Sequence, residues 1–166
     1  MGAYCVAIDP GGTTGIAVAK TDANPWTLSV QQLTGQHHLQ LLELLYKLRP
    51  NVVVCESFEN RGIGSAILEP REYIGVVKVY LQETRAAGVW QSASTGKAFW
   101  TDERLQRHNL YFQGARHARD AVRHYAHWRT FTLKDRSLLE RKQAGLVIRL
   151  PNSPNSTEVH PQTSSR

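Results

Sequence analysis

The sequence has few cysteines and no long apolar run, and each shortage excludes a class of protein. Its 166 residues include two cysteines, Cys5 and Cys55. Each lies in a short apolar stretch, so we expect two buried thiols rather than a disulfide framework. No stretch approaches the roughly 18 apolar residues of a membrane span. The apolar stretch 3–8 is too short for a signal peptide and ends at an aspartate, so we expect a cytoplasmic protein.

Composition and charge favour a globular domain with a basic second half. Hydrophobic residues make up 41% of the chain and charged residues 20%, and the net charge is +6. Residues 97–149 hold 12 basic and 5 acidic side chains, whereas residues 1–96 hold 7 basic and 8 acidic ones. Such a block indicates a polyanionic partner, nucleic acid or an anionic membrane, and solubility alone is an equal explanation.

The length predicts one domain over residues 1–150. A tail over 151–166, rich in Ser, Asn, Pro and Thr, is expected to be disordered. The hydrophobic pattern predicts an α/β fold with a mixed five-stranded sheet flanked by helices. Three strands form an antiparallel meander, and two helix-linked parallel strands follow. The strands are expected at 4–9, 16–20, 27–33, 51–56 and 89–92, and the helices at 38–48, 72–87, 101–107 and 115–128, with 133–144 as a further helical candidate.

Two of the expected strands end in a carboxylate. Asp9 ends the first buried strand before a glycine turn, and Glu56 ends the apolar run 52–55. A buried strand gains nothing from an unpaired charge. If the two strands are adjacent, the acids meet at one edge of the sheet, where a hard divalent cation would offset their repulsion. The alternatives are that Asp9 caps the turn and that Glu56 begins a solvated loop.

A third acidic element lies on the expected helix 115–128. His117 and Asp120 are spaced i and i+3, so they share a helix face and can point to the same place. Taken alone, a solvated helix face explains them better. His124 and His127 follow on the same helix, and we expect them to be surface histidines because the ligand spacing of a closed zinc site is absent.

Together these elements resemble a known family. The order of strands and helices with such acids looks like the ribonuclease H-like nuclease superfamily. Within it, Ala7-Ile-Asp-Pro-Gly-Gly-Thr-Thr-Gly15 resembles the first motif of RuvC Holliday-junction resolvases. The segments Val53-Val-Cys-Glu56 and His117-Ala-Arg-Asp-Ala121 resemble the second and last motifs. The resemblance covers roughly residues 4–128.

The resemblance implies a metal-dependent, structure-selective endonuclease that cleaves branched DNA. Asp9, Glu56, His117 and Asp120 would then be the catalytic residues and would hold two Mg²⁺ or Mn²⁺ ions for in-line phosphodiester hydrolysis. A neutral His117 would ligate a metal or orient the water. The family acts as homodimers, so a homodimer is expected as well.

Other side chains are expected to contact nucleic acid. In the family an aromatic after the Glu motif stacks at the junction, and here Phe58 stands at a slightly different offset. The remaining candidates are polar or basic and surround the motifs: Asn60, Arg61, Lys97, Arg116, Arg119 and Arg123. For each arginine, a solubilising surface charge is an equal explanation.

Three other functions remain as alternatives. A related nuclease would act on flap or fork DNA, or on structured RNA, with the same acids, and phosphate attraction does not distinguish these substrates. A non-catalytic nucleic-acid-binding module on this fold would be expected to have lost one of the acids. The turn after Asp9 also looks like the phosphate loop of actin-like ATPases and sugar kinases, which need two such domains, whereas this length provides one.

Overall fold

The chain folds around one mixed β-sheet. The computed structural model describes residues 3–22, 27–58, 68–140 and 147–149. The strand order is β5-β4-β1-β2-β3-β6. The strands are β1 (Tyr4–Asp9), β2 (Thr13–Lys20), β3 (Thr27–Thr34), β4 (Val52–Ser57), β5 (Ala87–Ser92) and β6 (Val147–Arg149). The helices are α1 (His38–Leu48), α2 (Leu68–Glu83), α3 (Ala93–Phe99), α4 (Asp102–Arg107) and α5 (Arg116–His127).

The strand pairing is that of the expected mixed sheet. Strand β2 pairs antiparallel with β1 and β3, which gives the meander. Strand β4 runs parallel to β1, and β5 runs parallel to β4. The short β6 adds an unexpected sixth strand, parallel to β3. The five expected strands are therefore confirmed, with one more at the β3 edge.

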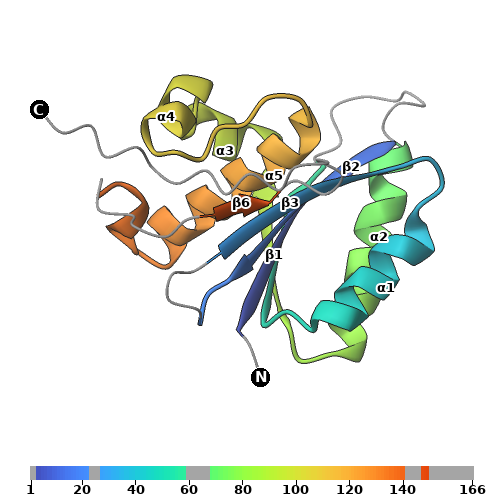
Figure 1. Cartoon of the computed structure of the whole chain (residues 1–166). Helices are drawn as coiled ribbons and strands as arrows, with labels where there is room; N and C mark the ends of the chain where they lie inside the picture. The colour runs from blue at the N-terminus through green and yellow to red at the C-terminus, as the bar shows by residue number, and fades with distance from the viewer. Residues whose placement is uncertain (1–2, 23–26, 59–67, 141–146, 150–166) are drawn as a thin grey trace, which may run out of the picture.

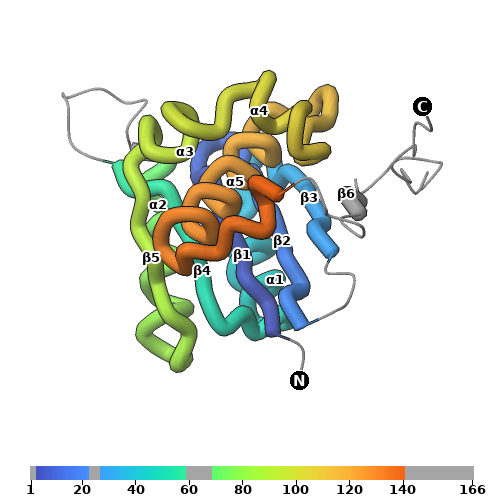
Figure 2. The backbone as a smooth tube through the Cα atoms, turned by 90° about the vertical axis from the view of Figure 1, so that its left-hand side faces the viewer, coloured from blue at the N-terminus to red at the C-terminus, as the bar shows by residue number. Residues whose placement is uncertain are grey.

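Helices cover both faces of this sheet (Figure 1). Because successive strand residues point to opposite faces, the two faces have separate cores. Helices α1 and α2 cover one core, which contains Ile8, Val53 and Cys55. Helix α5 covers the other, which contains Ala7 and Val54. Figure 2 shows α5 lying across the central strands, with α3 and α4 beside it.

Several local predictions are confirmed and others are wrong. Helix α1 spans the expected residues; it buries Leu41 and Leu45 and ends at Arg49 in a left-handed conformation. Helix α2 ends at Glu83, before the expected residue 87, because Ala87 begins β5 and donates its N–H to the Asn51 carbonyl.

The C-terminal part of the described chain departs most from expectation. Helix α5 continues into a π-helical turn at Trp128–Thr132. Residues 133–140 hold only the short 3-10 helix Arg136–Leu138, so the helical candidate 133–144 is wrong over its described part. Helix α3 was not expected, since Gly96 and its Ser and Thr neighbours are poor helix formers. The predicted tail 151–166 lies outside the described residues.

The two cysteines are free and buried, as expected. Cys5 lies in the core beneath α5, and Cys55 lies in the core beneath α1 and α2, so the sheet separates them. Among the helices that the structure describes, none is both long and apolar enough to cross a bilayer.

Candidate active site

The two strand-ending carboxylates lie on the α5 face of the sheet. Every second residue of a strand points to the same face, so Asp9 shares this face with Ala7 in β1, and Glu56 shares it with Val54 in β4. The parallel register pairs Ile8 with Cys55, so Asp9 and Glu56 follow as neighbours at the carboxyl ends of both strands. Both are buried, at 6% and 3% exposure, so Glu56 is not the solvated loop residue of its alternative.

Close approach of these carboxylates perturbs both of them. Burial, followed by the negative charges of Glu56 and Asp120, raises the pKa of Asp9 to about 8. Burial also acts to raise the pKa of Glu56, but hydrogen bonds with His124 and Asp9 hold it below its usual value. A divalent cation between the two carboxylates would offset their repulsion directly, so the donor set fits a hard metal ion.

A glycine lets α5 approach the sheet at this level. Gly15 in β2 pairs with Asp9 on one side and with Gln32 of β3 on the other. A Cβ atom added to Gly15 would lie 1.9 Å from the carbonyl oxygen of His117 and 2.5 Å from the backbone nitrogen of Ala118. The first turn of α5 thus rests directly on the backbone of β2, which no larger residue would permit.

Gln32 fixes the same turn by hydrogen bonds. Its Oε1 accepts from the backbone N–H of His117 at 3.0 Å and from that of Ala118 at 3.4 Å. The preceding residue, Ala115, makes no side-chain cap. The first N–H groups of a helix have no partners within it, so Gln32 performs the role of a cap from a neighbouring strand. Helix α5 is therefore positioned by the sheet itself.

The docked helix brings a histidine to each strand acid. His117 Nδ1 lies 2.8 Å from Asp9 Oδ2. Two turns further along the same face of the helix, His124 Nε2 lies 3.0 Å from Glu56 Oε2, and His124 Nδ1 lies 2.9 Å from Oε1 of Gln91. The expectation that His124 is a surface residue is wrong, because it is only 1% exposed; His127 is half-buried.

Asp120 lies between these histidines on α5 and is held by two basic side chains. Lys97 Nζ of α3 is 3.2 Å from Asp120 Oδ2, and Arg123 pairs with Oδ1. Arg123 also pairs with Asp102 and donates from Nε to the Trp100 carbonyl at 2.8 Å. The Asp120 carboxylate is thus fixed in direction and close enough to Asp9 to raise its pKa.

The structure adds one candidate to the ligands that the motifs suggested. Asp9, Glu56 and His124 each offer one ligand atom, and these three atoms lie within 4.8 Å of one another. His117 contacts the cluster through Asp9, and Asp120 adjoins it through its charge. The four expected residues are brought together, and His124 joins them.

The residues expected to contact nucleic acid fall into two groups. Lys97, Arg116 and Phe58 are exposed or partly exposed, with the Lys97 side chain at 44%. The other two described arginines are held by the protein: Arg123 is buried, and Arg119 donates to the carbonyls of Phe112 and Gly114. Arg123 is therefore a positioning residue for Asp120 and not a surface contact. Asn60 and Arg61 lie outside the described residues.

Sequence reasoning missed Gly15 as a docking point, Gln32, Gln91 and the role of His124. For His124 a signal existed, because the spacings of i+4 from Asp120 and i+7 from His117 place all three on one helix face. The two glutamines carry no such signal. Each acts through its register opposite Gly15 or Glu56, which only the paired sheet reveals.

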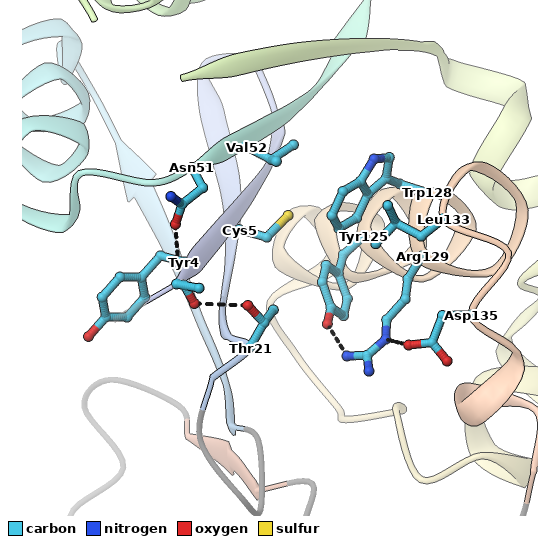
Figure 3. Close-up of a pocket in the computed structure, with 11 residues that line it drawn as sticks. Tyr4, Cys5, Thr21, Asn51, Val52, Tyr125, Trp128, Arg129, Leu133 and Asp135 are labelled. Carbon is cyan, nitrogen blue, oxygen red and sulfur yellow. Dashed lines mark hydrogen bonds and ion pairs between the residues drawn. The ribbon is translucent and has the colours of Figure 1, made fainter. Parts of the chain in front are cut away.

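A separate cavity of about 210 Å³ lies at the other end of the sheet (Figure 3). It is bounded by the first residues of β1 and β4, including Cys5 and Val52, and by Tyr125, Trp128 and Arg129 near the end of α5. Arg129 bridges the Tyr125 hydroxyl and Asp135 there. The cavity is thus distinct from the acidic cluster at the carboxyl ends of the strands.

Comparison with known proteins finds relatives in fold alone. No protein-family model matches the chain, and no curated protein matches its sequence significantly. Among solved structures, RuvC of T. thermophilus in complex with a Holliday junction substrate gives a TM-score of 0.59 at 18% identity, covering 78% of this chain and 97% of that one. The fowlpox virus Holliday junction resolvase gives 0.52 at 12% identity, covering 77% and 99%. The expected ribonuclease H-like fold is therefore confirmed: this chain has the fold of the RuvC-type resolvases.

Proposed function

We propose that the protein is a metal-dependent endonuclease that cleaves phosphodiester bonds in branched DNA, with the four-way Holliday junction as its leading substrate. One observation carries the proposal. The buried acids of β1 and β4 and the His117–Asp120 face of α5, which are far apart in sequence, converge at one edge of the sheet. Solved structures of the same fold include a RuvC bound to a junction, which supports this choice of substrate.

The proposed cofactor is Mg²⁺ or Mn²⁺, two ions in each site, held by Asp9, Glu56, His117 and Asp120. When bound, such ions activate a water nucleophile and stabilise the leaving oxygen of an in-line displacement. The protein prepares the site by burying the acids and fixing their directions. Arg123 and Lys97 hold Asp120, and the hydrogen bond from His117 holds Asp9.

His117 is placed to move a proton. When its Nδ1–H donates to Asp9 Oδ2, the neutral ring keeps a lone pair on Nε2. The ring is partly exposed, with 44% of the side chain accessible, so water and substrate can reach it. In this state His117 can, instead of binding an ion, orient the attacking water and accept its proton, while Asp9 fixes the ring and its tautomer.

Basic and aromatic side chains around the acids provide the DNA contacts in this proposal. Lys97 carries an exposed ammonium group beside Asp120, where it can contact a phosphate next to the cut. Arg116 is exposed at the first turn of α5. Phe58 is 37% exposed just beyond β4 and can stack on an unpaired base at the junction.

A homodimer is part of the proposal, because resolution of a junction needs two cuts on symmetry-related strands. We expect the protein to have the mass of two chains in light scattering. A monomeric mass both alone and on the junction would contradict this part of the proposal and leave the single site intact.

Cleavage of defined substrates tests the function. The protein is incubated with a labelled four-way junction, a duplex, a flap and a structured RNA, with Mg²⁺ or Mn²⁺. We expect the protein to cleave the junction fastest of the four substrates. We expect no cleavage by Asp9→Asn or Asp120→Asn. The exposed Asp22 lies at the other end of the sheet, so Asp22→Asn is a matched control that should cut like the wild type.

The outcomes separate the alternatives. Preferred cleavage of the flap or the RNA would assign the same site to a related nuclease. Junction binding without cleavage in either metal would favour a non-catalytic binding module. Equal cleavage by the wild type and both site variants would show that the assigned residues are not the active site.

A further inference from the structure

The side chain of Gln91 determines which nitrogen of His124 carries a proton. Gln91 lies in β5, paired with Glu56, and is buried. Its Nε2 donates to the backbone carbonyl of His124 at 3.3 Å, which leaves Oε1 facing His124 Nδ1 at 2.9 Å. The opposite orientation of the amide would bring two oxygens together. Since Oε1 only accepts, His124 Nδ1 must carry the proton.

With Nδ1 protonated, the neutral ring presents a lone pair at Nε2. That lone pair lies 3.0 Å from Glu56 Oε2. One cation can bind a carboxylate oxygen and an imidazole lone pair at this separation, whereas without a cation Nε2 needs a second ring proton to donate to Glu56.

The surrounding atoms favour a cation. Nε2 of His124 and the nearest oxygens of Asp9 and Glu56 all lie within 4.8 Å of one another. The 3.0 Å between His124 Nε2 and Glu56 Oε2 is short enough for one ion to bind both atoms. A second ring proton would make a single hydrogen bond, to Glu56, whereas a cation would bind all three groups.

We propose that His124 Nε2 is a nitrogen ligand of the cation held by Asp9 and Glu56, and that Gln91 fixes the ring for this role. The inference rests on the proposed function, because it concerns the same metal centre. A nitrogen ligand shifts preference away from Mg²⁺, which favours oxygen ligands, and toward transition ions such as Mn²⁺. The site should therefore discriminate between the two ions more strongly than an all-carboxylate site would.

Pulsed electron paramagnetic resonance of bound Mn²⁺ tests this directly. The full chain, labelled with ¹⁵N-histidine, should show a nitrogen coupling to the ion. A nitrogen coupling should persist in His117→Ala and in His127→Ala. The coupling from His124 should be lost in His124→Ala and in the more conservative His124→Gln, where any remaining coupling would come from His117. Gln91→Leu should retain the ligand but weaken Mn²⁺ binding by about 10–100-fold, the usual effect of losing a group that orients a ligand.

The outcomes distinguish this inference from the proposed function. If the wild type binds neither Mn²⁺ nor Mg²⁺, the metal-dependent function fails. If it binds Mn²⁺ without a histidine coupling, His124 is a proton donor to Glu56, and the inference fails while the metal centre stands. Loss of the coupling in His117→Ala alone would assign the ligand to His117 and would also overturn it. The wild-type and His117→Ala spectra together decide even if the His124 variants do not fold.

Discussion

Replacing Gly15 with alanine should displace the helix that completes the active site. The new Cβ would lie 1.9 Å from the His117 carbonyl oxygen and 2.0 Å from its carbonyl carbon, where real contacts stay beyond 3.0 Å. The first turn of α5 must therefore move away from β2 by about 1 Å, because both partners are backbone and neither can rotate aside. Overpacking of this kind costs about 1–3 kcal/mol, which lowers Tm by roughly 2–12 °C in a domain of this size.

The same displacement should also reduce the rate of junction cleavage. It moves His117 relative to Asp9, whose hydrogen bond is 2.8 Å long, and a misplacement of about 1 Å can cost about 100-fold in rate. Junction cleavage under single-turnover conditions and thermal melting measure the two effects. Gly75→Ala is the matched control, since nothing lies within 4 Å of its new Cβ. Gly75 lies inside helix α2, where alanine is a better helix former than glycine. Wild-type cleavage and Tm in Gly15→Ala would refute the proposed docking of α5.

Four further predictions concern the side chains of Asp9, Gln32 and Arg123. Folded Asp9 keeps a proton that the unfolded chain has lost, so the stability of the metal-free protein should fall as pH rises from about 4 to about 8. Asp9→Asn should remove this pH dependence and raise Tm at neutral pH, as measured by thermal melting with a chelator present. Excess Mn²⁺ should raise Tm of the wild type but not of Asp9→Asn; an equal rise in both would contradict the site. Gln32→Leu should destabilise the protein by about 1 kcal/mol in denaturant titrations, because it removes the acceptor for the N–H groups of α5. Gln32→Glu keeps an acceptor and should keep most of the stability. Equal losses of stability in the two variants would show that Gln32 does not cap α5. Arg123→Met should lower the free energy of unfolding by about 3–5 kcal/mol, because Asp120 stays buried with less charge compensation. Adding Asp120→Asn should recover part of that loss. If the losses of the two single variants simply add in the double variant, the pair does not interact.

Local patterns predicted the sheet and the identity of the acids, but not how the site is assembled. Apolar runs that end in Asp9 and Glu56 are visible in sequence because a carboxylate is costly at the end of a buried strand. The partners of these acids depend on which strand residues point toward α5. The pairing register of the strands determines which residues these are. Hence His124 was misassigned to the surface, although its spacing from His117 and Asp120 places it on their face.

Arginine posed a different difficulty. Arg116, Arg119 and Arg123 are equivalent in sequence, each a basic residue near the last motif. In the structure one is exposed, one is held by backbone carbonyls and one is buried between two aspartates. Charge counting cannot separate a phosphate contact from a structural ion pair. Only the positions of Asp102 and Trp100 on neighbouring segments show which role Arg123 has.

Assembly of the site from α5 has a consequence for protein synthesis. The contacts that complete the site join residues 108 positions apart, from Asp9 to His117, and 68 positions apart, from Glu56 to His124. A growing chain that has reached β5 already has both strand acids but lacks both histidines and Asp120. The acidic cluster therefore becomes complete only after α5 has been synthesised and has docked on Gly15. In the proposed nuclease, a chain still being synthesised lacks its active site, and cleavage activity arises only when the fold is complete.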